Sequence, residues 1–293
     1  MALATQNDKP AGRLYLVATP IGNLEDITLR ALRVLQECDF IACEDTRQTQ
    51  KLLSHFEIAK RLVSYHEHNE MTRAPELVIE LEQGARIALV SDAGTPLVSD
   101  PGHRLVTLCL RHHVPVVPVP GPSAIVAALA ASGLPTDEFL FAGFLPSRAA
   151  DRREALRRLG AEPRTVVVYE APHRLGDALR DARELLGDRK ACLAREITKV
   201  HEEFIRGTLS ELVDRTTKKP PRGEMTLLIA PAANGDLAVP SGAASTLSTR
   251  VEELISTSKM DHKAALKQAA RERGLNKRDA YRQLLLERPG KPN

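Results

Sequence analysis

Short apolar runs alternate with amphipathic segments along the first part of the chain. Leucines recur at helical spacing between these runs, for example Leu29, Leu32 and Leu35. Apolar runs of this length indicate buried strands, and a period of about 3.6 residues indicates amphipathic helices. The predicted strands are residues 14–18, 40–43, 62–65, 87–90 and 114–119, and the predicted helices are 28–37, 46–55, 74–83, 102–112 and 122–131. This alternation predicts an α/β fold with a parallel sheet covered by helices on both faces.

The pattern changes after Gly133, where strands begin to follow one another more closely. Predicted strands are residues 139–144, 165–169, 192–195 and 225–230, with an extended segment at 201–207. Predicted helices are residues 151–159, 175–186 and 209–215. Strands that are adjacent in the sequence favour a partly antiparallel sheet. The second part is therefore expected to form another α/β domain.

A polar stretch rich in Ala, Gly and Pro separates this second domain from a helical end. The predicted organisation is an N-terminal extension at 1–13, α/β domains at 14–134 and 135–231, a linker at 232–245 and a basic helical domain at 246–293. Helices are predicted at 247–257, 262–273 and 277–287. The last two flank Gly274, Leu275 and Asn276, a short turn that is typical of helix-turn-helix domains.

Charge is concentrated at the C-terminal end. The chain of 293 residues has a net charge of +3, but residues 250–293 carry 11 lysines and arginines against 6 acidic residues. A basic end on a near-neutral body favours an electrostatic docking arm for nucleic acid, while a solvated helical face is the alternative. Aromatic residues make up only 3% and tryptophan is absent. Nucleic-acid binding is therefore expected to use charge more than base stacking.

Several other classes of protein do not fit the sequence. Cys38, Cys43, Cys109 and Cys192 lie in apolar runs without C-x-x-C spacing, as expected for reduced core residues and not for a disulfide or zinc framework. No leader-like or membrane-spanning apolar run is present, so we expect a cytoplasmic protein. No metal is expected, because no H-E-x-x-H or paired-cysteine motif occurs.

Four loops rich in Gly and Pro follow predicted strands, at residues 19–24, 91–102, 119–124 and 169–174. Ligands of open α/β sheets bind beyond the carboxyl ends of the strands, and glycine lets the main chain approach them closely. Ordinary strand-to-helix turns explain any one such loop, but four of them favour a pocket for a flat heterocycle such as adenine. No G-x-G-x-x-G follows the first strand and no P-loop motif occurs, which excludes the common nucleotide folds.

The amino-acid sequences of these loops resemble those of the family of ribosomal RNA small subunit methyltransferases I. The matching strings are TPIGNLEDIT at 19–28, EDTR at 44–47, the stretch 91–102, PGPSA at 120–124, SGLP at 132–135, REITK at 195–199 and GE at 223–224. They span residues 14–230. Ala171 departs from the family, in which a serine is expected at this position.

The resemblance implies the fold of the tetrapyrrole methylases, with two α/β domains and S-adenosylmethionine in the cleft between them. It also implies a homodimer that methylates the 2′-oxygen of a cytidine ribose in the decoding region of 16S rRNA, or of the assembled small ribosomal subunit. The cofactor-binding residues implied by similarity are Pro20, Gly22, Asp92, Ala93, Gly94, Ser123, Ala124, Tyr169, Glu170, Glu224 and Met225.

Polar residues near the expected cleft provide catalytic candidates. We expect Asp45 or His66 to accept or orient the proton of the hydroxyl group, and Arg47 and Lys199 to hold the flanking phosphates. Asp45 is alternatively a helix cap, Lys199 part of an ion pair, and His66 an ordinary surface histidine. The expected RNA-binding residues are Arg174, Lys263, Lys267, Arg271, Lys277 and Arg278.

Two other functions remain open at this stage. A methylase of the same fold that acts on a tetrapyrrole or a protein fits the loops, but a basic tail is hard to explain for a small acidic macrocycle. A non-catalytic nucleic-acid-binding protein fits the tail but leaves the Gly- and Pro-rich loops unexplained.

Overall fold

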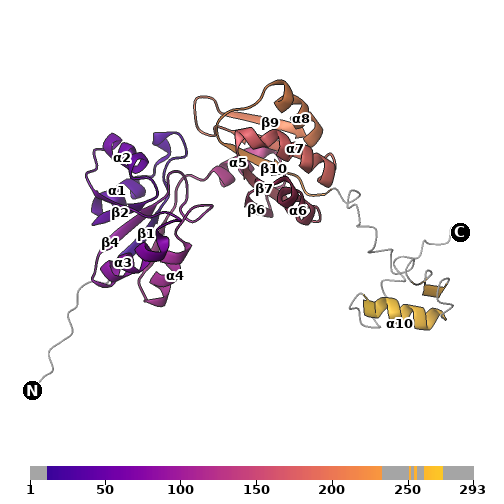
Figure 1. Ribbon diagram of the computed structural model, residues 1–293, viewed down its shortest axis with the longest axis horizontal. Coiled ribbons are helices and arrows are strands. Elements are labelled where there is room, and N and C mark those ends of the chain that lie inside the picture. The colour runs from indigo at the N-terminus through magenta and orange to yellow at the C-terminus, as the bar shows by residue number, and fades with distance from the viewer. Residues whose placement is uncertain (1–11, 233–250, 252–253, 256–260, 273–293) are drawn as a thin grey trace, which may run out of the picture. The chain divides into compact units, whose positions relative to one another are not determined.

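The computed structural model describes residues 12–232, 251, 254–255 and 261–272 (Figure 1). The chain divides into two compact units, Met1–Gly235 and Asp236–Asn293. The first unit contains two five-stranded sheets. The two sheets, one from each half of this unit, confirm that the chain forms two α/β sheets as predicted.

The first sheet is wholly parallel and has the order β3-β2-β4-β1-β5. Its strands are β1 (Arg13–Val17), β2 (Phe40–Cys43), β3 (Arg61–Ser64), β4 (Arg86–Val90) and β5 (Val116–Val119). Its helices are α1 (Leu29–Glu37), α2 (Thr46–His55), α3 (Glu70–Glu82) and α4 (His103–Arg111), and a short 3-10 helix, η1, spans Leu24–Asp26. From β1 the chain crosses to β2, and from β4 it crosses to β5 on the other side. The adjacent carboxyl ends of β1 and β4 therefore form the crevice in which such sheets bind ligands.

Both faces of this sheet are buried, as its uninterrupted apolar strands require. Along β4, Ile87 and Leu89 belong to the hydrophobic cluster under α3 and α4, whereas Ala88 and Val90 belong to the cluster under α1 and α2. Successive residues of a strand point to opposite faces, so one strand contributes to two cores. The expectation of helices on both faces is confirmed.

Helix α3 is the element whose start differs most from the prediction. The predicted helix spans residues 74–83. In the structure the helix begins at Glu70, and Pro75 lies inside it. The carbonyl oxygen of His66 accepts the N–H groups of Asn69 and Glu70, which adds a turn before the proline.

The second sheet is mixed and has the order β6-β7-β10-β8-β9. Its strands are β6 (Phe139–Phe144), β7 (Thr165–Glu170), β8 (Lys190–Arg195), β9 (Glu203–Thr208) and β10 (Met225–Ile229), and its helices are α6 (Ala149–Leu159), α7 (Pro172–Leu186) and α8 (Leu209–Lys218). Strands β6 and β7 are parallel, and the other pairs are antiparallel. The predicted partly antiparallel sheet is confirmed.

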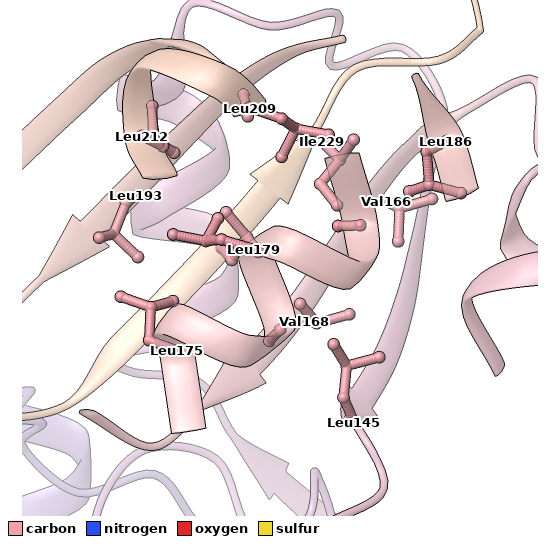
Figure 2. Close-up of a cluster of buried hydrophobic side chains, with 14 of the residues drawn as sticks. Leu145, Val166, Val168, Leu175, Leu179, Leu186, Leu193, Leu209, Leu212 and Ile229 are labelled. Carbon is pink, nitrogen blue, oxygen red and sulfur yellow. The ribbon is translucent and has the colours of Figure 1, made fainter. Parts of the chain in front are cut away.

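One face of the second sheet is covered by α6, α7 and α8. Figure 2 shows Leu175 and Leu179 of α7 with Val168 of β7 and Leu193 of β8 in this core, and all four side chains are buried. The buried apolar residues of α7 recur at helical spacing, so the helix presents one apolar stripe to the sheet.

The other face is covered by α5 (Ala124–Ser132), although this helix follows β5 of the first sheet. Ile125, Ala128 and Leu129 pack against Val167 and Leu228 of the second sheet. Gly133, in the left-handed conformation with φ of 79°, ends the helix. The helix thus packs beyond its own half of the chain, whereas the domain boundary at residue 134, which stays a prediction, assigns it to the first half.

The second unit contains α10 (His262–Glu272), which confirms the predicted helix at 262–273. The side chain of Asp261 caps it by accepting the N–H of Ala264 at 2.7 Å. Leu266 and its neighbours pack against Val251 and Leu254. Residues 233–245 of the linker, the turn at 274–276 and the helix at 277–287 lie outside the described residues.

The remaining class predictions concern the cysteines and membranes. All four cysteines are free and buried, as expected of core residues. Within the described part of the chain, none of the helices has the length and apolar character needed to span a bilayer.

The core under α7 provides a test of the packing. We expect Leu179→Ala to lower the free energy of unfolding by ~2–5 kcal/mol, because Leu179 is fully buried and alanine leaves a cavity. The matched control is Ile79→Ala on α3, whose side chain is 54% exposed, and its effect is expected to stay within about 0.5 kcal/mol. Urea denaturation of both variants measures this, and equal losses would contradict the packing described.

Candidate active site

A cavity of about 460 Å³ opens where the carboxyl ends of the first sheet meet the second sheet. This volume lies in the range of small-molecule sites, about 300–1,000 Å³. Loops after β1, β2, β4 and β5 form one wall, and the ends of β6, β7 and β10 with the loop after β8 form the other. The lining residues are Ile21, Glu44, Asp92, Ala93, Gly94, Thr95, Val98, Ser99, Asp100, Ser123, Ala124, Phe144, Tyr169, Glu170, Ala171, Pro172, Ile197, Gly223, Glu224, Met225 and Thr226.

Main-chain hydrogen bonds join the loops of the first wall. Thr19 and Gly94 exchange N–H···O bonds of 2.9 and 3.0 Å, and the Thr19 hydroxyl donates to the carbonyl oxygen of Ser91 at 3.2 Å. Gly94 has a φ of 79°, and a Cβ there would lie 3.4 Å from the side chain of Ile21. The loops after β1 and β4 are therefore held together as one surface.

The rest of the β4 loop has an unusual backbone. Leu97 and Ser99 have φ values of 72° and 66°, and Gly102 has a φ of 140°. Such conformations are strained for residues other than glycine, and they persist where the surroundings fix them, often at functional sites. Here they place Ser99 and Asp100 on the cavity.

Aromatic rings and a buried carboxylate form the second wall. The rings of Tyr169 and Phe144 lie 5.4 Å apart. Burial raises the pKa of Tyr169 to about 12, so its hydroxyl stays a hydrogen-bond donor at neutral pH. The buried Glu170 accepts the N–H of Ala171 at 2.9 Å through Oε1. Its Oε2 has no hydrogen-bond partner among the described residues, and burial raises the pKa of Glu170.

The loop after β8 closes one side of the cavity. Glu196 and Glu224 are joined by two hydrogen bonds of 3.0 Å, from the N–H of each residue to an oxygen of the other. Lys199 Nζ lies 3.1 Å from Glu196 and 3.0 Å from Glu224. Burial opposes the charge of Lys199, but hydrogen bonds to Glu224 and Glu196 outweigh it and raise the pKa of the lysine.

The same loop also contacts the first wall. The hydroxyl of Thr198 donates to Asp26, and the stem of Lys199 lies against Gly22, where a Cβ would be 2.4 Å from the lysine Cγ. A side chain at position 22 would displace the stem of Lys199, so close packing favours glycine there.

The cavity is acidic. Its carboxylates are Glu44, Asp92, Asp100, Glu170 and Glu224, and among the described lining residues none is lysine or arginine. Burial, followed by the charge of Glu44, raises the pKa of Asp100 to about 6. Burial and the charge of Asp92 likewise raise the pKa of Glu44. A site of this kind favours a ligand with positive charge.

Most of the residues expected to bind a cofactor lie on the cavity. These are Asp92, Ala93, Gly94, Ser123, Ala124, Tyr169, Glu170, Glu224 and Met225. Pro20 and Gly22 are outside the lining, but Ile21 between them is part of it. Their role in binding a cofactor stays a prediction.

The four catalytic candidates lie beside the cavity and not on its wall. Asp45 caps α2 by accepting the Arg47 N–H at 2.8 Å and pairs with the Arg47 guanidinium group. Its own N–H donates to Asp92 at 3.0 Å. Hydrogen bonds from Arg47 lower the pKa of Asp45 to about 2. His66 donates its main-chain N–H to Asn69, and its ring Nδ1 has no partner among the described residues.

The predicted RNA-binding residues belong to both units of the chain. Arg174 lies 3.2 Å from the buried Glu170 and donates to the carbonyl oxygen of Leu145, so it is largely committed within the protein. Lys267 is exposed on α10, and Lys263 and Arg271 belong to the same helix. Lys277 and Arg278 lie outside the described residues.

Sequence reasoning missed several lining residues, most clearly Asp100, Phe144 and Ile197. Asp100 belongs to the same Gly- and Pro-rich stretch as Asp92, so its loop was identified but its direction was not. Phe144 carries no local signal, because an apolar residue at the end of a strand is typical of any core. Ile197 lies in the loop after β8, within the string at 195–199 that resembles the family, but the resemblance gave it no role. No group of His, Cys, Asp and Glu in the described residues has the geometry of a metal site.

The raised pKa of Asp100 predicts how stability depends on pH. An unfolded aspartate loses its proton near pH 4, whereas Asp100 keeps it to about pH 6 in the folded chain. The folded state therefore binds more protons in this window, and its stability falls as the pH rises from about 4 to 6. We expect Asp100→Asn, without ligand, to raise the melting temperature at pH 8 and to leave it nearly unchanged at pH 4.

The matched control for this test is Asp137→Asn, which changes an exposed aspartate outside the cavity. Its melting temperature is expected to follow that of the wild type at both pH values. A wild type more stable than Asp100→Asn at pH 8 would show that the carboxylate is stabilised in the fold.

Known proteins share both the sequence and the fold. "Ribosomal RNA small subunit methyltransferase I" of Halalkalibacterium halodurans is 50% identical over 92% of this chain and 93% of its own. The protein of the same name from Synechocystis is 47% identical over 94% of this chain and 98% of its own. Among solved structures, a uroporphyrin-III C-methyltransferase from Thermus thermophilus, complexed with S-adenyl homocysteine, is 24% identical, with a TM-score of 0.54 over 75% of this chain and 97% of its own.

The family model of the tetrapyrrole (corrin/porphyrin) methylases matches residues 13–213, which include the described loops of both cavity walls up to the β8 loop. Together with the full-length relatives, this match shows that the chain belongs to the tetrapyrrole methylase family and, within it, to the ribosomal RNA small subunit methyltransferases I.

Proposed function

We propose that the chain transfers a methyl group from S-adenosylmethionine to the 2′-oxygen of a cytidine ribose in the decoding region of 16S rRNA. The observation that carries the proposal is the identity of about half of all residues with relatives named as small-subunit rRNA methyltransferases, over nearly the full length of both chains. The acidic cavity supports the first half of it, the use of a positively charged methyl donor.

The residues present fit this cofactor. S-adenosylmethionine supplies a methyl group bound to a positively charged sulfur atom, and it also carries an ammonium group. The carboxylates of Glu44, Asp92 and Asp100 complement such a ligand electrostatically. The buried Oε2 of Glu170, which has no partner among the described residues, supplies an acceptor for a donor group of the ligand.

The predicted contacts distribute the cofactor over both walls. Main-chain groups of Ala93, Ser123 and Ala124 suit the flat adenine, because loops of this kind expose N–H and C=O groups. Gly94, whose own N–H and C=O bind Thr19, would hold the loop in place beside the ligand. Tyr169, Glu170, Glu224 and Met225 would hold it from the second sheet, and Pro20 and Gly22 shape the loop that carries Ile21.

The walls act mainly by positioning. Methyl transfer needs the attacking oxygen in line with the departing group, and orientation alone supplies up to ~7–11 kcal/mol in favourable cases. The hydrogen-bonded pair of loops at Thr19 and Gly94, and the fixed pair Glu196 and Glu224, keep the walls rigid.

The hydroxyl proton needs an acceptor or an orienting group beside the cavity. Asp45 is a weak base, because Arg47 keeps its pKa at about 2, so it suits the role of orienting a hydroxyl. His66 has a buried ring Nδ1 without a hydrogen-bond partner among the described residues, and an imidazole nitrogen is a suitable proton acceptor. Arg47, whose side chain is 87% exposed, and Lys199 are proposed to contact phosphates that flank the target.

The rest of the RNA would be held by the basic helical end, through Lys263, Lys267, Arg271, Lys277 and Arg278. Arg174 would contribute less, because its guanidinium group is engaged with Glu170 and Leu145. The homodimer and the cytoplasmic location implied by the family stay predictions.

The proposed reaction has a direct test. We expect the purified chain to transfer labelled methyl from S-adenosylmethionine to small ribosomal subunits or to 16S rRNA that lack the modification. Digestion and mass mapping should place the label on the ribose of a cytidine in the decoding region. Label on a base would contradict the 2′-oxygen as acceptor, and label only on a precorrin or a protein would favour another methylase of this fold.

The proton acceptor is tested by variants outside the cavity wall. We expect His66→Ala to lower the rate of methyl transfer by ~100-fold or more, as loss of a general base does, and Asp45→Asn to lower it less. Cofactor affinity, measured by calorimetry, should stay near that of the wild type in both. Near-wild-type rates for both would dismiss the two residues. A pH–rate profile of Asp100→Asn would then test Asp100, whose pKa of about 6 suits a base.

A further inference from the structure

A second hollow lies on the same unit, beside α8 and β9, and has a volume of about 380 Å³. We call it the α8 groove. Its basic residues are Arg195, Arg215, Lys218 and Lys219, and Pro220 and Pro221 form one of its edges. None of these residues lines the acidic cavity.

The acidic side chains of the groove are largely engaged. Glu203 pairs with Arg195 at 3.2 Å and with Arg215 at 2.6 Å. Glu211 accepts the main-chain N–H of Thr208 at 2.8 Å in the capping box of α8. Asp214 remains as an exposed acid without an ion pair in the described part of the chain.

Three exposed basic side chains at the end of α8 and after it are not paired with a carboxylate in the described part of the chain. Lys218, Lys219 and Arg222 lie within five residues and are exposed, and no ion pair involves them among the described residues. Most other basic residues nearby, such as Arg195 and Lys199, are paired with carboxylates. The end of α8 and the loop at residues 219–223 after it therefore carry positive charge that no ion pair in the described part of the chain compensates.

The loop is also held in place. Pro220 and Pro221 restrict its backbone, because each proline fixes its own φ. Gly223 follows with a φ of 87°, and a Cβ there would be 2.2 Å from the Glu196 carboxylate. Glu224 is then joined to Glu196 by hydrogen bonds in both directions. Cations on a restrained loop lose little freedom when they bind a ligand.

Two segments of the chain connect the α8 groove with the acidic cavity, one at the end of β8 and one before β10. Arg195 ends β8 in the groove, and Ile197, two residues on, lines the cavity. Pro221 lies on the groove, and Gly223 and Glu224 line the cavity. Arg195 is also paired in register with Met225, a cavity residue. An RNA strand whose target nucleotide enters the cavity would therefore bring the neighbouring nucleotides past the groove.

We propose that Lys218 and Lys219 of the α8 groove, together with Arg222 next to its edge, bind the phosphodiester backbone of the RNA next to the methylated nucleotide. The inference rests on the proposed function. A polyanion is the ligand class that unpaired lysines and arginines select, since they bind phosphates without reading sequence. The acidic cavity repels the same phosphates, so the division of charge directs the sugar to one site and the backbone to the other.

The test uses the full chain with Lys218→Gln, Lys219→Gln and Arg222→Gln combined. The control combines Arg13→Gln, Arg111→Gln and Lys190→Gln, which remove the same charge from exposed positions outside both the groove and the cavity. Affinity for 16S rRNA transcript is measured across a salt series. Affinity for S-adenosylmethionine is measured by calorimetry as a check of the fold.

We expect the groove variant to bind 16S rRNA at least about tenfold more weakly than the control variant, with unchanged affinity for S-adenosylmethionine. The slope of log affinity against log salt should fall by about 2, since each lost phosphate contact on a single strand removes ~0.7. Equal affinity of the two variants would overturn the inference. So would weaker binding to assembled subunits with unchanged binding to the transcript, because the groove would then contact a ribosomal protein.

These outcomes are separate from the fate of the proposed function. If the wild type methylates rRNA but the groove and control variants bind it equally, only the groove assignment fails. If the wild type transfers no methyl group to rRNA, the proposed function fails whatever the variants do.

Discussion

The packing of α5 on the second sheet is the contact on which the site depends. The helix begins at Ala124, beside Ser123, and both residues line the cavity on the side of the first sheet. Its buried Ile125 and Leu129 pack on the other sheet. Burial of each such side chain contributes ~1.5–3 kcal/mol, which is enough to fix the helix. The two walls are thus held at a defined separation by one continuous helix.

The far end of the same helix is secured by a cation. Arg206 of β9 donates to the carbonyl oxygens of Ser132 and Ala131, at the carboxyl end of α5. These carbonyl groups have no partner within the helix, and the end of a helix dipole favours a positive charge. The arginine therefore completes the attachment of α5 to the second sheet at a point away from the cavity.

Electrostatics divides the surface near the site into two regions. Carboxylates crowd the cavity at a cost in stability, as the raised pKa values of Asp100 and Glu44 show. A positively charged cofactor offsets that cost when it binds, so the empty site is the less stable form. Among the described residues no lysine or arginine lines the cavity, and Lys199 and Arg174 reach only its edge, where they pair with Glu224 and Glu170.

The sequence predicts that the first sheet is parallel and the second partly antiparallel, and it predicts most helices and the loops of the site. It does so because glycine and proline mark the loops, and apolar periodicity marks the strands. Side-chain direction is beyond such patterns. Asp100 reaches the cavity only through the left-handed Leu97 and Ser99, and no local rule predicts those conformations. The packing of α5 across the two sheets is equally hidden, because its apolar residues surround the helix on most sides.

Strained backbone conformations occur on both sides of the cavity. Leu97 and Ser99 lie on one side of the cavity, and Glu196 and Thr198, with φ values of 49° and 65°, lie on the other. Each such residue costs of order 1–3 kcal/mol, and it persists only if its surroundings determine it. For Glu196 the surroundings are Glu224 and Lys199, and for Thr198 they include Asp26 of the opposite wall. Four of the six described non-glycine residues with positive φ thus lie where the two halves of the site meet, whereas Glu57 and His113 follow the ends of α2 and α4. The contacts at the site hold the loops after β4 and β8 in conformations that a relaxed loop would not adopt.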